Sequence, residues 1–277
     1  MVENPEINSL NSNKILSILV SRDGFYFCIS QDNKKVTAFY QQKFSSPQRP
    51  EELLREIRSA LTHSFKEEVS SVFIGVKVIY AHTLYALVPR PYFLEEKLSD
   101  YLKFNTRLMS TDEMTYDKLI TMNANLVYVP FTNINNFLYD QFGQFTFKHA
   151  VGLFVDQCKQ KENEGINVYI NVYPTHFDLC VFDDGDLKLC NSFDYFSPED
   201  FVYYVLFVFE QLKLDPETVA LFLCGEIDKD SKTFDLLFTY VRDVSFLEKN
   251  QGLILKNTPL EEAELHQYQL LLNAIAQ

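Results

Sequence analysis

Histidine, cysteine and aspartate are the residues of this sequence that could bind a metal or carry out covalent chemistry. The densest acidic group is Asp183-Asp184-Gly185-Asp186. Asp-Gly between two alternating apolar segments is a hairpin signal, and the group lacks the ligand spacing of a calcium loop. The histidines form no His-x-x-x-His or Glu-paired motif; they are His63, His82, His149, His176 and His266. We expect a turn at 183–186, surface or hydrogen-bonded histidines, and no metal site.

Motifs for covalent catalysis and phosphate binding are also missing from the sequence. There is no Gly-x-Ser-x-Gly, no Gly-x-x-x-x-Gly-Lys and no Gly-x-Gly-x-x-Gly, and the chain holds only 8 glycines. A Cys/His pair could form only through the fold. The 5 cysteines are odd in number and contain no Cys-x-x-Cys pair, and several fall inside strand patterns. We predict free thiols in a reducing cytoplasm, no catalytic residue and no cofactor.

Composition limits the partners that the protein can have. Apolar residues make up 47% of the 277 residues, which predicts a folded chain, and the net charge of −13 opposes nucleic acid. The longest apolar run, 201–209, is too short to cross a bilayer. We expect a cytoplasmic protein with a disordered polar tail at 1–14, no direct membrane insertion, and a protein or peptide partner.

Alternating apolar residues organise the second half of the chain. They predict three antiparallel strands at 167–173, 177–182 and 187–193, separated by turns at 174–176 and 183–186. Ser197 and Pro198 are typical of a helix N-cap and first helical position. A further strand, 219–223, leads to Cys224-Gly225-Glu226. The order is therefore strand, strand, strand, helix, strand.

The same order occurs near the N-terminus, which indicates a duplication. The segments ILSILVS, FYFCIS and KVTAFYQQ predict three strands from Ile15 onwards. A helix is predicted at 50–61 and a buried strand at 71–76. Ile18-x-Val20 aligns with Ile170-x-Val172, and 72–75 aligns with 221–225. Internal repeats of this kind determine the fold.

The remaining elements are predicted from shorter patterns. Between the copies we expect strands at 83–89, 126–130 and 145–147, and helices at 92–104, 133–142 and 149–161. After the second copy we expect a helix at 231–240, a strand at 244–246, and a helix that ends at Ala276. Thr258, Pro259 and Glu261 form a capping-box pattern at the start of this last helix.

The duplicated order resembles the actin-like (ribonuclease H-like) fold, in which two such domains face each other across a cleft. The segments 84–104 and 125–161 also resemble the layout of the actin-like assembly proteins of type IV pilus and type II secretion systems. The resemblance implies an α/β protein with mixed five-stranded sheets and two lobes. It implies an N-terminal lobe with an inserted subdomain at 15–148 and a C-terminal lobe at 149–277.

Three stretches resemble a more specific family, the uncharacterised Bacteroidetes domain-of-unknown-function family 3822. They are Val127-Tyr128-Val129-Pro130, the segment 191–212 (NSFDYFSPEDFVYYVLFVFEQL), and His266-Gln267-Tyr268. This family has no assigned activity, so the resemblance implies a bacterial protein of this fold more than a function.

Actin-like ATPases carry an Asp-x-Gly in each lobe, and the positions aligned with these motifs here hold Ile18-x-Val20 and Ile170-x-Val172. Branched apolar side chains cannot ligate Mg²⁺. The first hypothesis is therefore a non-catalytic, pseudo-ATPase binding or scaffold protein. The alternative is a divergent nucleotide-binding switch or ATPase of the actin/sugar-kinase superfamily, for which Asp23, Gly24 and Gly225 are the candidate residues because they lie at strand ends.

The helix expected after Ser197 contains the apolar segment FVYYVLFVF. A helix that is apolar on all sides is usually buried on all sides. Aromatic residues are also enriched at binding surfaces, so Tyr203, Tyr204 and Phe207 are the candidate partner-binding residues.

Overall fold

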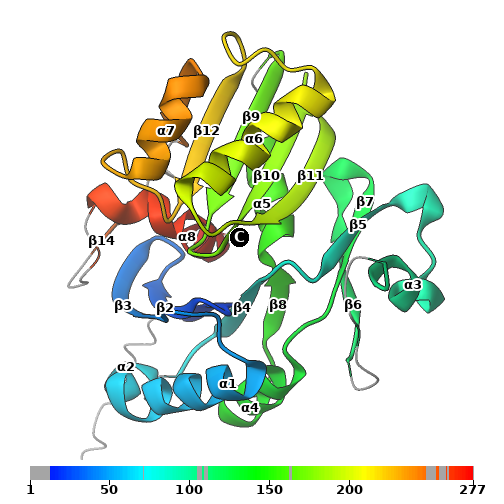
Figure 1. The fold of residues 1–277 in the computed structure, drawn as a ribbon. Coiled ribbons are helices and arrows are strands. Elements are labelled where there is room, and N and C mark those ends of the chain that lie inside the picture. The colour runs from blue at the N-terminus through cyan, green and yellow to red at the C-terminus, as the bar shows by residue number, and fades with distance from the viewer. Residues whose placement is uncertain are drawn as a thin grey trace, which may run out of the picture.

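The computed structural model describes residues 13–70, 72–104, 108, 112–161, 164–247, 254–255, 260 and 262–276. Within this part of the chain, two larger sheets lie one above the other, and a three-stranded sheet extends to one side (Figure 1). We call the larger sheets, with their helices, the first and second lobes.

Five strands have the same order in both lobes, and β14 adds a sixth strand at the edge of the first sheet. In the first lobe the sheet order is β14-β3-β2-β1-β4-β8, and in the second it is β11-β10-β9-β12-β13. Each lobe has an antiparallel meander of three strands, and its first strand then pairs in parallel with the strand that follows the helix. The first-lobe strands are β1 (Lys14–Ser21), β2 (Gly24–Gln31), β3 (Lys35–Lys43), β4 (Gly75–Ala81), β8 (Thr146–His149) and β14 (Ile254–Leu255). The second-lobe strands are β9 (Ile166–Val172), β10 (His176–Asp183), β11 (Asp186–Asp194), β12 (Ala220–Gly225) and β13 (Asp243–Phe246).

Irregularities of the backbone also repeat between the lobes. The register shifts at 29–30 in β2 and at the aligned position 181–182 in β10. Both meanders then turn through two residues with positive φ, at 32–33 and at 184–185. Two consecutive residues with positive φ are the geometry of a tight hairpin turn. The turn predicted from Asp-Asp-Gly-Asp is therefore confirmed, and the internal repeat extends to single residues.

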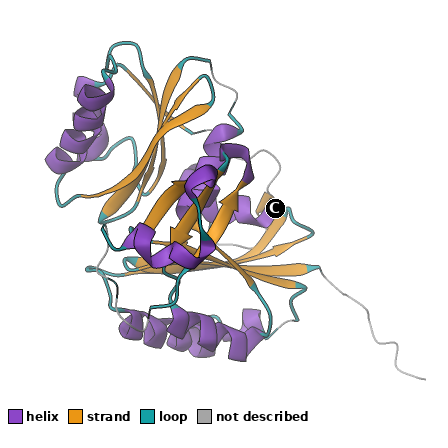
Figure 2. Ribbon diagram, turned by 90° about the vertical axis from the view of Figure 1, so that its right-hand side faces the viewer, coloured by secondary structure: helices purple, strands orange, loops and turns teal. Residues whose placement is uncertain are grey.

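Helices cover both faces of each sheet (Figure 2). Helices α1 and α4 pack together under the first sheet, and α8 lies on its other face against β1 and β2. Helix α5 contacts β4 of the first lobe and β10 of the second. Helices α6 and α7 cover the outer face of the second sheet. The helices are α1 (Pro50–Ser59), α2 (Lys66–Val69), α3 (Leu98–Leu102), α4 (Thr132–Phe142), α5 (Ala150–Lys159), α6 (Pro198–Leu212), α7 (Lys232–Tyr240) and α8 (Gln269–Ala276).

Helix α6 begins as the sequence predicts. The Ser197 side chain accepts a hydrogen bond from the backbone N–H of Asp200, and Pro198 occupies the first turn. Phe201, Val205 and their neighbours on one face are buried in the second-lobe core. An N-cap of this kind stabilises a helix by about 1 kcal/mol, so the cap and the buried face together fix where α6 starts.

The strand predicted at 71–76 is wrong. Strand β4 starts at Gly75 and ends at Ala81, whereas Val72 is 88% exposed and Ile74 is 66% exposed. These two apolar residues precede the sheet and imitate a buried strand. The alignment of 72–75 with 221–225 between the two copies is therefore wrong as well. Val20 lies opposite Tyr80 and Val172 opposite Gly225, so Tyr80 is the first-lobe counterpart of Gly225.

The predicted helix at 92–104 is mostly wrong as well. Only α3 forms there, after short 3-10 turns at Arg90–Tyr92 and Glu95–Lys97. Tyr92 is 76% exposed and Phe104 is 83% exposed, so little apolar area holds a longer helix in place. The three-stranded sheet beside it has the order β5-β7-β6, and β6 was not predicted. Its strands are β5 (Tyr85–Pro89), β6 (Thr115–Leu119) and β7 (Ala124–Tyr128).

The two ends of the chain differ from the expected boundaries. The capping box at Thr258, Pro259 and Glu261, and residues 1–12 of the expected tail, lie outside the described residues. The described C-terminal part is a 3-10 segment, Glu262–Tyr268, followed by α8. Strand β14 and helix α8 both pack on the first sheet, and the division at 148/149 stays a prediction.

Two histidines form a buried pair where the first sheet meets the three-stranded sheet. His149 Nδ1 accepts from the Val151 N–H, so its Nε2 carries the proton and donates to His82 Nδ1 at 3.3 Å. His82 Nδ1 also accepts from the Leu84 N–H at 3.2 Å. Burial lowers the pKa of His82 to about 3 and holds that of His149 well below its usual value. Both rings are neutral in the folded protein.

Neither the backbone nor the packing at Gly225 accommodates a side chain. This glycine has φ +83°, and a Cβ there would lie 2.2 Å from the Val172 carbonyl oxygen. We expect Gly225→Ala to lower the free energy of unfolding by roughly 2–4 kcal/mol. The methyl group would push β12 away from β9, and an alanine at positive φ adds backbone strain. Gly75→Ala is the matched control, since a Cβ there meets nothing within 4 Å; chemical denaturation should find it unchanged within about 0.5 kcal/mol. Equal stability of the two variants would contradict the prediction.

The buried histidine pair predicts a pH dependence of stability. A histidine with a depressed folded pKa is protonated first in the unfolded chain, so its stabilising effect is lost as pH falls below about 6.5. We expect His82→Gln to flatten the fall in unfolding free energy between pH 6 and pH 4 by up to about 1.4 kcal/mol per pH unit. His63→Gln replaces an exposed ring and is the control. An unchanged slope in His82→Gln would contradict the assignment.

Candidate functional site

The hairpin tips of the two lobes touch each other. Thr175, in the β9–β10 tip, donates its hydroxyl hydrogen to the carboxylate of Asp23, in the β1–β2 tip, with distances of 2.8 and 3.0 Å to the two oxygens. His176 Nδ1 lies 3.8 Å from the same carboxylate. Asp23 is only 3% exposed. Its own tip is held by Ser21, whose Oγ donates to the Gly24 carbonyl and accepts from the Asp23 N–H.

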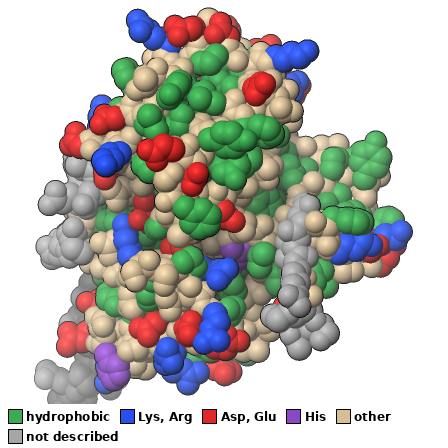
Figure 3. Space-filling view, viewed as in Figure 1, with side chains coloured by type: hydrophobic (Ala, Val, Ile, Leu, Met, Phe, Trp, Pro, Cys, Tyr) green, Lys and Arg blue, Asp and Glu red, His purple; other side chains and the backbone are tan. Residues whose placement is uncertain are grey.

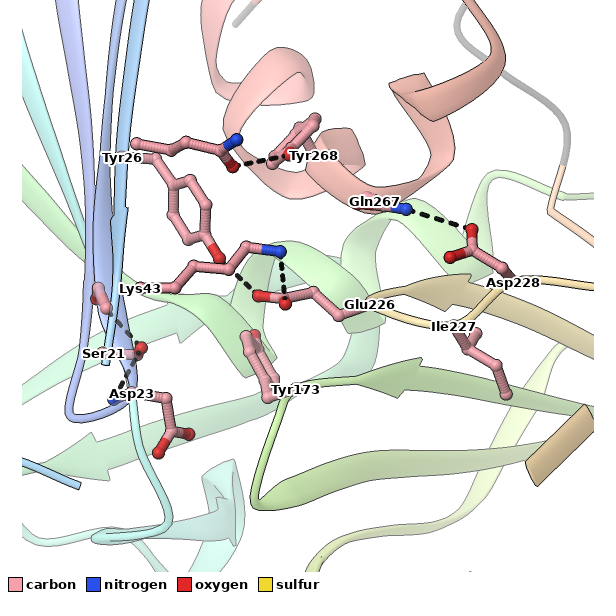
Figure 4. A network of polar contacts seen from close by, with 12 residues as sticks. Ser21, Asp23, Tyr26, Lys43, Tyr173, Glu226, Ile227, Asp228, Gln267 and Tyr268 are labelled. Atoms are coloured by element: carbon pink, nitrogen blue, oxygen red, sulfur yellow. Dashed lines mark hydrogen bonds and ion pairs between the residues drawn. The ribbon is translucent and has the colours of Figure 1, made fainter. Parts of the chain in front are cut away.

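A second contact between the lobes lies next to the tips. Glu226, which follows the last residue of β12, accepts a hydrogen bond from the Tyr26 hydroxyl and pairs with Lys43 Nζ at 2.7 Å (Figure 4). Burial and the Glu226 carboxylate together raise the pKa of Tyr26 above its ordinary value. One carboxylate of the second lobe is thus bound by two side chains of the first.

The C-terminal 3-10 segment also joins the lobes. His266 Nε2 donates to the Ile227 carbonyl at 2.9 Å, and Gln267 donates to Asp228 at 3.0 Å. The next residue, Tyr268, donates its hydroxyl to Gln41 of β3 at 2.8 Å. Consecutive side chains therefore bind opposite lobes (Figure 4). We call 266–268, together with Glu226, the clasp.

Among the described residues, two spaces with linings from both lobes lie near the tip contact. The space beside the clasp, lined by Gly225, Tyr26 and Tyr268, has a volume of about 20 Å³, which is room for about one water molecule. The other is an open cavity of about 410 Å³. Its lining comes from both lobes and consists of Arg22, Asp23, Ser45, Ser46, Pro47, Ala81, His82, Thr83, Leu84, Thr175, His176, Asp194 and Phe196. We call it the inter-lobe cavity.

The polar groups of the inter-lobe cavity are mixed in charge. Asp23 and Asp194 contribute carboxylates, and Arg22 contributes a guanidinium whose Nε donates to the Gln48 carbonyl. His82 and His176 are each 5% exposed, and within the described residues neither Nε2 has a hydrogen-bond partner. The same described part of the chain contains no group of three His, Cys, Asp or Glu side chains that could hold a metal ion.

The structure separates the three residues nominated for nucleotide binding. Asp23 lines the inter-lobe cavity, whereas Gly225 lines the small space beside the clasp. Close packing against β3 requires a glycine at position 24, because a Cβ there would lie 2.4 Å from the Gln42 carbonyl oxygen. Their use by a nucleotide stays a prediction.

The two Ile-x-Val pairs lie within the lobes, and of the four residues only Val172 also lines the small space beside the clasp. Ile18 and Val20 lie inside β1, Ile170 and Val172 lie inside β9, and all four side chains are buried in the lobe cores. The residues that meet across the lobes are at the tips, 22–23 and 174–176. Sequence analysis missed Thr175, His176 and Glu226 as site residues. The turn at 174–176 and the position of Glu226 directly after Gly225 were the available signals.

The aromatic residues of α6 divide between core and surface. Tyr203 is 62% exposed and Phe207 is 41% exposed, and their rings stack with centroids 6.3 Å apart. Tyr204 is half-buried and stacks on Phe193 of β11. Hydrophobic side chains gather on this part of the second lobe in the space-filling view (Figure 3). Their use by a partner stays a prediction.

Comparison with solved structures shows the fold. A Bacteroides thetaiotaomicron VPI-5482 protein with an actin-like ATPase fold and unknown function superposes with a TM-score of 0.76, at 22% identity over 87% of this chain and 93% of that one. The PilM–PilN type IV pilus biogenesis complex matches with a TM-score of 0.59, at 11% identity over 95% and 98% of the chains. The ethanolamine utilization protein EutJ of Carboxydothermus hydrogenoformans gives 0.51, at 9% identity over 97% and 91%.

The actin-like fold class predicted from the duplicated strand order is therefore confirmed. No curated protein matches the sequence. Among the described residues, no helix has both the length and the apolar content that a membrane crossing needs. All five cysteines are free thiols. The model of the protein family of unknown function DUF3822 matches residues 4–244, and the chain belongs to this family.

Proposed function

We propose that this protein is a non-catalytic actin-like protein that binds a protein or peptide partner and acts as a binding or scaffold module. The observation that carries the proposal is the direct contact between Asp23 and Thr175, which joins the hairpin tips of the two lobes. Both oxygens of Asp23 are occupied by a group of the protein itself.

Charge and volume support the same conclusion. Asp23 and Asp194 line the inter-lobe cavity against a single guanidinium, that of Arg22, and Lys43 is already paired with Glu226. A phosphate charge placed about 4 Å from a carboxylate is repelled by about 4 kcal/mol at an effective dielectric constant near 20. The space beside the clasp has a volume of only about 20 Å³. Small-molecule sites usually have a volume of roughly 300 Å³ or more. A nucleoside triphosphate that spanned both spaces would have to break the tip contact.

A partner segment meets neither obstacle. The inter-lobe cavity of about 410 Å³ has room for one or two side chains of a partner, and it combines apolar walls with hydroxyl and imidazole groups. The PilM neighbour, whose structure is a complex with PilN, is an actin-like protein seen with a protein partner. The exposed rings of Tyr203 and Phe207 offer a second contact surface.

A titration with Mg-ATP tests the absence of nucleotide chemistry. We expect calorimetry to give no binding heat and thermal unfolding to show no shift at millimolar Mg-ATP. The divergent-ATPase alternative predicts saturable binding that Asp23→Ala weakens. Thr175→Val keeps the shape of the side chain and removes the donor, so it reports separately on the tip contact, whose loss should reduce stability by about 1–3 kcal/mol. Saturable binding by the wild type, weakened by Asp23→Ala, would overturn the proposal.

A quantitative pull-down tests the aromatic surface. Tyr203→Ala combined with Phe207→Ala should lower partner capture at least tenfold, because a pair of exposed aromatic anchors contributes about 2 kcal/mol or more to an interface. Tyr139→Ala on α4 is the matched control, since that ring is 58% exposed on the other lobe. Equal capture by both variants would remove α6 from the binding surface and leave the inter-lobe cavity as the candidate.

A further inference from the structure

We propose that Cys180 and Cys190 are a redox modification site, in which a hydroperoxide converts two thiols into a disulfide between β10 and β11. The two residues lie directly opposite each other in the antiparallel pair, and their Sγ atoms are 3.4 Å apart. No other pair of cysteines among the described residues has a thiol–thiol hydrogen bond.

The hydrogen-bond ladder places this pair at a position that accepts a disulfide. The Tyr195 N–H donates to the Thr175 carbonyl at 3.0 Å, which makes 175/195 a hydrogen-bonded pair. Such pairs alternate with non-hydrogen-bonded pairs along an antiparallel ladder. Cys180 lies an odd number of positions beyond Thr175, and the register shift comes only after Val181. Cys180/Cys190 is therefore a non-hydrogen-bonded pair.

This pair type brings the backbones close enough for a bond. The Cα atoms of non-hydrogen-bonded pairs are about 4.5 Å apart, inside the range of about 4.4–6.8 Å that disulfides span. The two sulfurs already point at each other, so closing the bond needs small rotations of the side chains. The β10–β11 backbone can keep its pairing.

The difference in solvent exposure between the two thiols indicates which of them reacts first. Cys190 is partly exposed and meets the oxidant first, whereas Cys180 is fully buried. The Cys190 thiolate attacks the peroxide oxygen, the O–O bond breaks, an alcohol or water leaves, and Cys190 is left as a sulfenic acid. Cys180 then loses its proton and attacks the Cys190 sulfur, and a second water leaves. Two thiols and one hydroperoxide give one disulfide, one alcohol or water, and one further water.

The environment makes Cys180 a resolving thiol and not a peroxide sensor on its own. Burial beside Cys190 raises the pKa of Cys180 well above its ordinary value. Its thiol is therefore a weak nucleophile toward a free peroxide, and its place opposite Cys190 is what brings it within reach of a sulfenic acid there. The new bond would tie β11, the edge strand of the second lobe, covalently to β10. Two positions along, Ser192 bonds both Asp178 of β10 and Tyr85 of the three-stranded sheet.

Peptide mapping after oxidation tests this inference. The reduced protein is treated with hydrogen peroxide, alkylated under denaturing conditions and digested with trypsin. Lys188 lies between the two cysteines, so the disulfide should appear as two linked peptides. We expect alkylation to fall from five thiols to three, and dithiothreitol to restore all five.

Variants separate this pair from the other cysteines. Cys190→Ser should abolish the linked peptide and leave thermal unfolding nearly unchanged. Cys180→Ser should leave Cys190 as a sulfenic or sulfinic acid. Cys158→Ala removes a buried cysteine of α5 and should keep the linked peptide. Five thiols that stay alkylatable after peroxide, or linkages spread over several cysteines, would overturn the proposal.

Discussion

The contact between the lobes is centred on one hydrogen-bonded pair of side chains that are far apart in the sequence. Thr175 and Asp23 meet at hairpin tips, where each lobe exposes the turn of its first meander. A buried carboxylate without a partner is costly, so the tip of one lobe needs the tip of the other. The clasp around Glu226 and the spaces near the tips follow from this arrangement.

Duplication explains why the two tips can meet. Each lobe repeats the same order of five strands, the same register shift and the same two-residue turn. The copies differ where they touch. Gly225 allows β12 to approach Val172 closely, while its counterpart Tyr80 is a large buried ring. Glu226, which binds Tyr26 and Lys43 of the first lobe, comes directly after this glycine.

Sequence patterns predicted the meanders and α6 well, because alternation and caps are local signals. They failed at Val72 and Tyr92, where exposed apolar residues imitate buried ones. The contacts between the lobes could not be predicted, for another reason. Tyr26 and Glu226, like His82 and His149, are brought together only by the packing of separate elements. Asp23 was correctly placed at a strand end, but its partner Thr175 belongs to the opposite lobe.

The end of the chain has a consequence for how the molecule is made. Leu270, Leu271 and Leu272 of α8 are buried against the first sheet, and Lys77 of β4 donates to the Ala274 carbonyl at 2.8 Å. Strands β1 and β2 leave the ribosome long before the helix that covers them. Until α8 has been synthesised, one apolar face of β1 and β2 lacks this cover, which exposes the nascent chain to chaperones and to aggregation.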